Sequence, residues 1–190
     1  MSMTTHGSLQ YPSVASDPRI AELRAHIRDV PDFPKPGILF KDITPLLSDA
    51  RAFRLTIDLF EESLAQAHAD RVVGIESRGF IFGAALAQRL GVGFVPVRKP
   101  GKLPYKTRRV TYQTEYSTDT LEIHEDAVPR GARVIIVDDL LATGGTAAAT
   151  AQLVEDQGGS VASFAFVVEL DFLSGRGRLG GREIVSLIHY

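Results

Sequence analysis

The apolar residues of the chain follow two patterns, and each pattern predicts one kind of secondary-structure element. Spacings of three and four residues, which place side chains on one helix face, begin after Asp17-Pro18 and again after Ser48-Asp49, where N-cap residues stand. The apolar faces of these two predicted helices carry Ile20, Leu23, Ile27 and Val30 in the first and Phe53, Ile57, Phe60 and Leu64 in the second. The first helix ends before a stiff, proline-rich loop that contains Pro31, Pro34, Pro36 and Gly37.

Short apolar runs predict buried strands. They occupy residues 71–75, 94–98, 133–137, 161–168 and 184–189, and further extended candidates occupy 110–116 and 120–124. Helices are predicted over 80–90 and 146–157, each followed by a glycine that can end it. The helix over 80–90 is apolar nearly all round, which predicts that it is sandwiched between two surfaces. Strands that alternate with helices indicate an α/β fold with helices on both faces of a parallel sheet.

Composition adds limits on size and compartment. The 190 residues are 44% hydrophobic and 23% charged, so we expect one globular domain over 17–190 after a flexible N-terminus of residues 1–16. The chain has no cysteine, which excludes disulfides, zinc–thiolate sites and a cysteine nucleophile. No apolar run approaches the ~20 residues of a membrane span, and the N-terminus does not resemble a signal peptide. We therefore expect a cytoplasmic protein without membrane contact.

The charge balance restricts the ligands. Lys and Arg number 21 against 23 Asp and Glu, a formal net charge of −2, so no global positive field would attract a polyanion. We expect no nucleic-acid partner, and any phosphate ligand must be bound by local groups. The five histidines show no metal-ligand spacing, and we assign them no role.

One segment combines features of a phosphate site. The strand predicted over 133–137 is followed by Asp138 and Asp139, a glycine-rich turn and a helix start. Ligands of open α/β sheets bind beyond the carboxyl ends of strands, and a helix N-terminus offers unpaired amides to an anion. The predicted phosphate-binding residues of this turn are Ala142, Thr143, Gly144, Gly145 and Thr146. Carboxylates beside a phosphate would repel it, so we expect the two acids to face ribose hydroxyls, with a hard cation nearby.

A second turn and a basic run could hold further phosphate. The sequence Glu76-Ser77-Arg78-Gly79 again joins a strand to a helix, although Arg78 could instead pair with Glu76 at the surface. Basic residues gather in a Pro- and Gly-rich loop over about 99–113, together with Arg98. Such a run can be a solvated face, and its interleaved Tyr105 and Tyr112 mildly suggest nucleic acid. Beside two phosphate turns, a mobile loop that closes over a diphosphate is the preferred interpretation.

The segment 133–146 resembles the motif by which type I phosphoribosyltransferases bind phosphoribosyl pyrophosphate (PRPP): four apolar residues, two acids, a linker and Thr-Gly-Gly-Thr. Residues 33–44, 74–83, 98–104 and 115–116 are similar to the adenine-using members of that family. The resemblance implies the type I phosphoribosyltransferase fold, a mainly parallel twisted sheet flanked by helices, with a small N-terminal hood over about 30–44. It also implies transfer of the 5-phosphoribosyl group from PRPP to adenine in purine salvage, which gives AMP and pyrophosphate. Mg²⁺ held mainly by the substrate, and a homodimer, are implied as well.

The resemblance also assigns roles to residues. PRPP would be bound by Asp138, Asp139, Ala142, Thr143, Gly144, Gly145 and Thr146. Pyrophosphate would be bound by Glu76, Ser77, Arg78, Gly79, Arg98, Lys99 and Lys102. Adenine would be bound by Leu39, Phe40, Lys41 and Leu170. Phe40 would stack on the base while the main chain around it reads the exocyclic amine, so the lysine at 41, where many relatives carry arginine, changes little. Leu170 fits a core position equally well.

Glu115 is the catalytic residue that the resemblance implies. By residue type alone it would be an ordinary surface acid on an edge strand. Beside the reacting base it has two possible roles, which are to take a proton from the adenine ring or to stabilise a cationic transition state.

Two other functions remain open from the sequence. One is transfer to a different base, such as hypoxanthine, guanine or xanthine. The other is a PRPP-sensing repressor, which would need a DNA-binding module, whereas the segment before Pro31 is predicted to hold one helix only.

Overall fold

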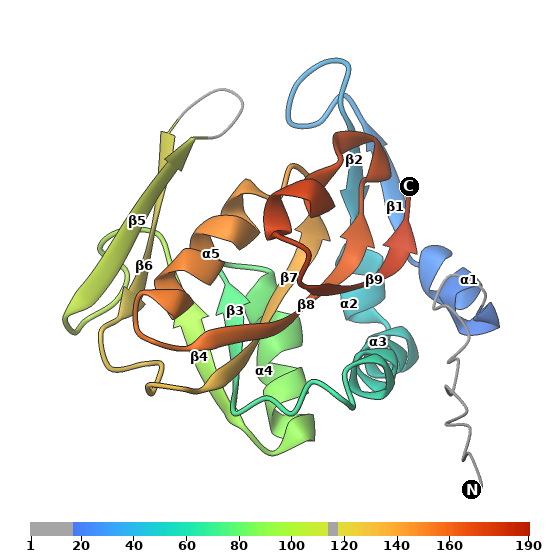
Figure 1. Cartoon of the computed structure of the whole chain (residues 1–190). Coiled ribbons are helices and arrows are strands. Elements are labelled where there is room, and N and C mark those ends of the chain that lie inside the picture. Colours follow the sequence, from blue (N-terminus) through green and yellow to red (C-terminus); the bar gives the residue numbers. More distant parts are fainter. Residues whose placement is uncertain (1–16, 114–117) are drawn as a thin grey trace, which may run out of the picture.

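Parallel strands form the centre of the fold. The structure is a computed structural model, and it describes residues 17–113 and 118–190 (Figure 1). Within these ranges a five-stranded parallel sheet has the order β4-β3-β7-β8-β9. The strands are β3 (Arg71–Ile75), β4 (Gly93–Val97), β7 (Arg133–Leu141), β8 (Ser160–Glu169) and β9 (Glu183–His189). The predicted α/β fold with a parallel sheet is confirmed. The N-terminus of residues 1–16 and Glu115 lie outside the described residues.

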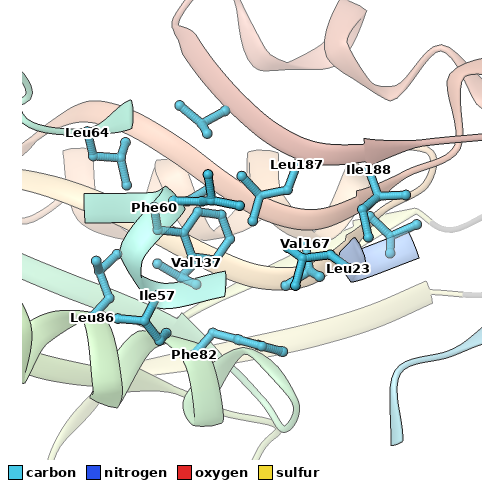
Figure 2. Close-up of a cluster of buried hydrophobic side chains, with 14 of the residues drawn as sticks. Leu23, Ile57, Phe60, Leu64, Phe82, Leu86, Val137, Val167, Leu187 and Ile188 are labelled. Carbon is cyan, nitrogen blue, oxygen red and sulfur yellow. The ribbon is translucent and has the colours of Figure 1, made fainter. Parts of the chain in front are cut away.

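Helices cover both faces of this sheet because its central strands alternate their side chains between two cores. Ile135 and Val137 of β7 join the core that also takes in α1 (Pro18–Arg24), α2 (Thr44–Ser48), α3 (Ala50–Ser63) and α4 (Gly79–Leu90). Figure 2 shows part of this core, where α3, α4 and the sheet meet. Val134 and Ile136 join the opposite core, beneath α5 (Gly145–Glu155) and η3 (Gly175–Leu179).

Two antiparallel hairpins stand apart from the main sheet. The first joins β1 (Arg28–Pro31) to β2 (Leu39–Asp42), and the second joins β5 (Thr107–Gln113) to β6 (Thr118–His124). Figure 1 shows them on opposite sides of the molecule, with the end of β7 and the start of α5 between them. A short helical segment, η2 (Asp171–Leu173), follows β8. None of the helices described is long and apolar enough to cross a membrane.

The helix predicted from Pro18 is shorter than expected. It begins as predicted, with the Asp17 carboxylate accepting from the Arg19 amide, but it ends at Arg24. Ile27 and Val30 were therefore wrongly assigned to it. Val30 lies in β1 opposite Phe40, because residues 28–31 pair with β2 instead of extending a helix.

Three other predictions need correction. The strand predicted to stop at Val137 continues to Leu141, because its pairing with β8 continues past the two acids, which therefore lie within β7. The basic loop predicted over 99–113 ends earlier, since residues 107–113 pair with β6 as strand β5. Helix α4 is not sandwiched within the chain, because Ile81 is 42% exposed on its outer face.

Candidate active site

The turn between β7 and α5 has the shape of an anion cradle. Gly144 occupies the N-cap of α5 with φ of 79°, in the left-handed region that glycine favours. A Cβ at Gly144 would also collide with the carbonyl oxygen of Gly175. The turn encloses a cavity of about 80 Å³, whose walls include every predicted residue from Ala142 to Thr146. The helix amides and the threonine hydroxyls are suited to a phosphate there.

The turn between β3 and α4 lies against the same strand. A Cβ at Gly79 would come within 2.6 Å of the Val137 carbonyl oxygen and 3.0 Å of Asp138 Oδ1. Glycine is therefore needed for the start of α4 to approach β7 this closely. The two turns share a second cavity of about 240 Å³, which is lined by Glu76, Ser77, Arg78, Lys99, Tyr112, Asp119, Leu121, Asp138, Asp139 and Thr146. The predicted phosphate turns and acid pair thus meet around one space.

Arg78 reaches across this space instead of pairing with Glu76. Its Nε lies 2.5 Å from Oδ2 of Asp139, which is only 5% exposed. Its guanidinium carbon lies 5.7 Å from the ring centre of Phe40 in β2. The alternative of a surface pair between Arg78 and Glu76 is therefore wrong. Arg78 links the acid pair to the hairpin that carries Phe40.

Asp138 differs electrostatically from its neighbour. Burial raises the pKa of Asp138 well above its usual value, and the adjacent Asp139 carboxylate raises it further. Its Oδ1 accepts from the Asp139 amide at 2.9 Å. The pair therefore consists of one carboxylate neutralised by Arg78 and one that binds a proton more tightly than an exposed aspartate. Such a group is suited to hydrogen bonds with hydroxyls.

Glu76 is engaged with the basic segment. Its Oε2 accepts from the Lys99 amide at 2.8 Å and from Arg98 Nε at 3.2 Å. Partial burial opposes ionisation of this carboxyl, but the hydrogen bonds from Lys99 and Arg98 outweigh it and lower the pKa of Glu76. These contacts make Glu76 an anchor for the basic segment.

A second acid, which the sequence did not single out for a role, holds the same segment. Glu122 is 3% exposed, accepts from the Gly101 amide at 3.1 Å and lies 3.2 Å from a guanidinium nitrogen of Arg109. Lys99 Nζ lies 3.3 Å from Asp119. The sequence offered no signal for this role, because strand alternation places a residue between two core positions on the opposite face. The segment predicted as a mobile basic loop is thus tied to β6.

The predicted base-binding residues lie on β2, outside the main sheet. Phe40 packs edge-on against Phe33 at 5.1 Å between ring centres, and Leu39 is 51% exposed. Lys41 Nζ lies 2.7 Å from Asp29 and 3.8 Å from the ring centre of Tyr190. Among the described strands β2 pairs only with β1, so its outer edge keeps unpaired main-chain groups.

Leu170 lies at some distance in sequence from this hairpin. It packs partly buried against the core beneath α3 and α4. That position fits its core alternative, and contact with a base remains a prediction.

Tyr112 is a site residue whose role sequence reasoning missed. Its hydroxyl lies 3.0 Å from Thr146 Oγ1, so hairpin β5–β6 touches the turn that begins α5. Burial raises the pKa of the Tyr112 phenol, which stays protonated at neutral pH. Its alternation with basic residues had only suggested stacking on nucleic acid.

One cluster in the described chain could in principle hold a metal. Glu169, Asp171 and His189 place ligand atoms within 4.8 Å of one another. However, Arg176 Nε donates to Glu169 at 2.6 Å, and His189 Nδ1 lies 2.9 Å from an Asp171 oxygen. The guanidinium already supplies positive charge to the buried carboxylate, so we interpret the cluster as an ion-pair network.

Comparisons with known proteins bear on this site. A family model described as phosphoribosyl transferase domain matches residues 46–178, which include both turns. An adenine phosphoribosyltransferase of Sorangium cellulosum is 58% identical over 185 residues, 95% of this chain and 92% of the relative. The crystal structure of adenine phosphoribosyltransferase from Thermoanaerobacter pseudethanolicus has a TM-score of 0.88 at 57% identity and covers 90% of this chain and 99% of its own. The crystal structure of the Saccharomyces cerevisiae enzyme, complexed with an imino-altritol bisphosphate and adenine, has a TM-score of 0.84 at 46% identity. The match covers 89% of this chain and 98% of the yeast chain.

Proposed function

The chain belongs to the adenine phosphoribosyltransferases, and on that basis we propose how its residues perform the reaction. The enzyme transfers the 5-phosphoribosyl group of PRPP to adenine and releases AMP and pyrophosphate. The observation that carries the assignment of residues is the cavity of about 240 Å³ shared by the two glycine-bearing turns and the acid pair. It can take a ribose between two phosphate sites.

We propose that the turn 142–146 binds the 5′-phosphate. Support comes from the N-terminus of α5 and the threonine hydroxyls around the small cavity. Asp138 and Asp139 would accept hydrogen bonds from the ribose hydroxyls. The fixed position of Asp139 against Arg78 supports this role, because a preorganised acceptor loses less entropy on binding.

We propose that the pyrophosphate group is bound by Ser77, Arg78 and Gly79 together with Arg98, Lys99 and Lys102 of the basic segment. Lys99 lines the shared cavity. Glu76 would act indirectly, since its carboxylate positions Arg98 and the Lys99 amide and would repel a bound anion. This modifies the sequence prediction, which counted Glu76 among the pyrophosphate ligands.

We propose that adenine lies beside Phe40 and is read by the main chain of residues 39–41. Carbonyl groups accept from the exocyclic amine of adenine, and a 6-oxo purine has no donor at that position. The free edge of β2 supports this mode of reading. The side chain of Lys41 is occupied by Asp29 and Tyr190, which fits its lack of a direct role in base choice.

Magnesium fits the donor set of the cavity. Mg²⁺ prefers oxygen ligands and commonly takes one or two carboxylates together with substrate phosphates and waters. Asp138 and Asp139 are the cavity carboxylates best placed beside the ribose, while most ligands would come from PRPP. When bound, the ion would neutralise charge on the pyrophosphate.

Glu115 is proposed as the catalytic residue next to the base. In sequence it lies between β5 and β6, whose hairpin contacts the 5′-phosphate turn through Tyr112. The ring nitrogen of adenine would attack the anomeric carbon opposite the departing pyrophosphate, through an oxocarbenium-like state. Glu115 would accept the adenine proton or stabilise the positive charge. Holding the reactants in line would supply much of the rate.

We further propose a homodimer that works in the cytoplasm. The outer face of α4, with Ile81 exposed, supports a partner surface, and the absence of cysteine fits a reducing compartment.

The test is turnover by the purified chain with PRPP, Mg²⁺ and a panel of adenine, hypoxanthine, guanine and xanthine. We expect AMP and pyrophosphate from adenine alone. A 6-oxo purine that is a better substrate than adenine would overturn the proposal that the main chain of β2 selects adenine. Asp138→Asn with Asp139→Asn should weaken PRPP binding, and an unchanged dissociation constant would remove these residues from the ribose site.

A further inference from the structure

We propose that Arg178 of η3 is an additional ligand for the 5′-phosphate, a cation that reaches the turn 142–146 from the C-terminal part of the chain. The inference rests on the proposed phosphate site. It assigns a charged side chain to a turn that otherwise offers neutral amides and hydroxyls.

The first observation is how closely η3 packs on the turn. A Cβ at Gly175 would collide with the carbonyl oxygen of Ala142, and a Cβ at Gly144 would collide with that of Gly175. The two backbones are therefore in direct contact. In a 3₁₀-helix with three residues per turn, positions i and i+3 share a face, so the contact of Gly175 brings Arg178 to the same side.

The second observation is where the Arg178 side chain goes. A terminal guanidinium nitrogen lies 3.6 Å from the Cβ position of Gly145, at the first turn of α5. The Cβ of Arg178 lies 3.4 Å from the Cβ position of Gly144. The guanidinium thus lies beside the helix N-terminus where an anion binds most favourably.

The third observation is that Arg178 has no carboxylate partner in the part of the chain that the structure describes. Its neighbours differ, because Arg176 pairs with Glu169 and Arg182 pairs with Glu155. The side chain of Arg178 is also solvent-exposed, so it can reorient onto a ligand. A guanidinium can donate two parallel hydrogen bonds to a phosphate, which neutral donors cannot match in strength.

A positive charge at this turn is needed to bind a phosphate. Its formal net charge is −2, and the cavity next to the turn contains two carboxylates. A phosphate dianion there requires local positive charge, and Arg178 supplies it at the end of PRPP opposite the basic segment. Since this contact exists with substrate and transition state alike, it should affect binding more than turnover.

The experiment compares Arg178→Gln and Arg178→Lys with the control Arg54→Gln. Arg54 is an exposed arginine of α3, on the other face of the sheet. We expect Arg178→Gln to raise the KM for PRPP and the inhibition constant of AMP by about tenfold or more, as for loss of a charge-assisted hydrogen bond. The kcat and the inhibition constant of pyrophosphate should stay within about twofold. The lysine variant should recover part of the loss.

Calorimetric binding of ribose 5-phosphate provides a readout that does not depend on turnover. We expect weaker binding to Arg178→Gln than to wild type or Arg54→Gln. Equal binding to all three proteins would overturn the inference, as would equal weakening of AMP and pyrophosphate, which would indicate damage to the fold. Loss of adenine transfer by the wild type, with ribose 5-phosphate binding intact, would instead contradict the proposed function alone.

Discussion

At the scale of single residues, the two glycines of the turn 142–146 have unequal surroundings. Gly144 combines a positive φ with direct contact to Gly175, whereas a Cβ at Gly145 would meet Tyr112 and Arg178 at ordinary contact distances of 3.5 and 3.6 Å. Substitution of the two glycines by alanine should therefore have different effects. Gly144 is required by the backbone, and Gly145 by the space that a ligand would occupy.

We expect Gly144→Ala to lower the free energy of unfolding by about 2 kcal/mol, as is usual for an alanine forced to positive φ in a tight contact. Gly145→Ala should change it by less than about 1 kcal/mol while it weakens PRPP binding. Urea unfolding and PRPP titration of both variants check this. Equal destabilisation by the two substitutions would contradict the geometry.

Asp138 leads to a prediction about pH. Because the folded protein binds the Asp138 proton more tightly than the unfolded chain, stability falls as the pH rises from about 4 through the raised pKa. Asp138→Asn removes this loss. The variant should therefore have a higher Tm than wild type at pH 8, and the difference should shrink towards pH 4, while PRPP binding weakens. A Tm difference that does not change with pH would show that burial does not raise this pKa.

At the scale of elements, the segment after β4 makes contacts with two acids that its composition did not indicate. The Glu76 carboxylate accepts hydrogen bonds from Arg98 Nε and the Lys99 amide, and the Glu122 carboxylate accepts one from the Gly101 amide. A single sequence shows the charges and glycines of the basic run but not the acids that contact it, and its mobility remains a prediction. Residues 107–113 pair with the next strand along the chain, β6, and the sequence had predicted extended residues over 110–116 and 120–124, so only the earlier start of these strands was missed.

We expect Glu122→Ala to loosen this segment. The Gly101 amide would lose its buried acceptor, so its hydrogen exchange should accelerate and affinity for pyrophosphate should fall by about five- to tenfold. AMP binding should change less, since the turn 142–146, proposed to bind the 5′-phosphate, is untouched. Glu125→Ala, an exposed acid just after β6, is the control. Unchanged exchange at Gly101 would show that the segment is held by other contacts.

The elements also show what the sequence could predict. Local signals predicted the strand over 71–75 and the C-terminal end of α4, namely a run of branched residues and a left-handed glycine cap at Gly91. The helix expected to reach Val30 failed because partner strand β2, rather than local spacing, determines residues 28–31. The same limit applied to the site. The glycine turns and acids have local signatures, whereas the contacts of Arg78, Tyr112 and Arg178 depend on distant elements.

At the scale of the whole molecule, the parallel sheet brings the residues of the candidate site together. Carboxyl ends of β3 and β7 meet at one edge, where each continues into a turn and a helix N-terminus. The two hairpins then approach from opposite sides, β1–β2 with the strand proposed to bind adenine and β5–β6 with Tyr112. Arg78, Lys99 and Arg178 lie at this edge, so a chain with net charge −2 has local positive groups where we propose that the anionic substrate binds.

The same view predicts the effect of assembly. Helix α4 begins at Gly79, in the turn proposed to bind pyrophosphate, and exposes Ile81 two residues later, so a partner packed on this face would also stabilise the turn. We expect Ile81→Asp to convert the proposed dimer to a monomer, because a desolvated carboxylate opposes association, and to raise the KM for PRPP several-fold. Light scattering after size-exclusion chromatography measures the mass. Ala65→Asp, on an exposed position after α3, should leave mass and KM unchanged. A dimer that persists in Ile81→Asp would place the partner surface elsewhere on the molecule.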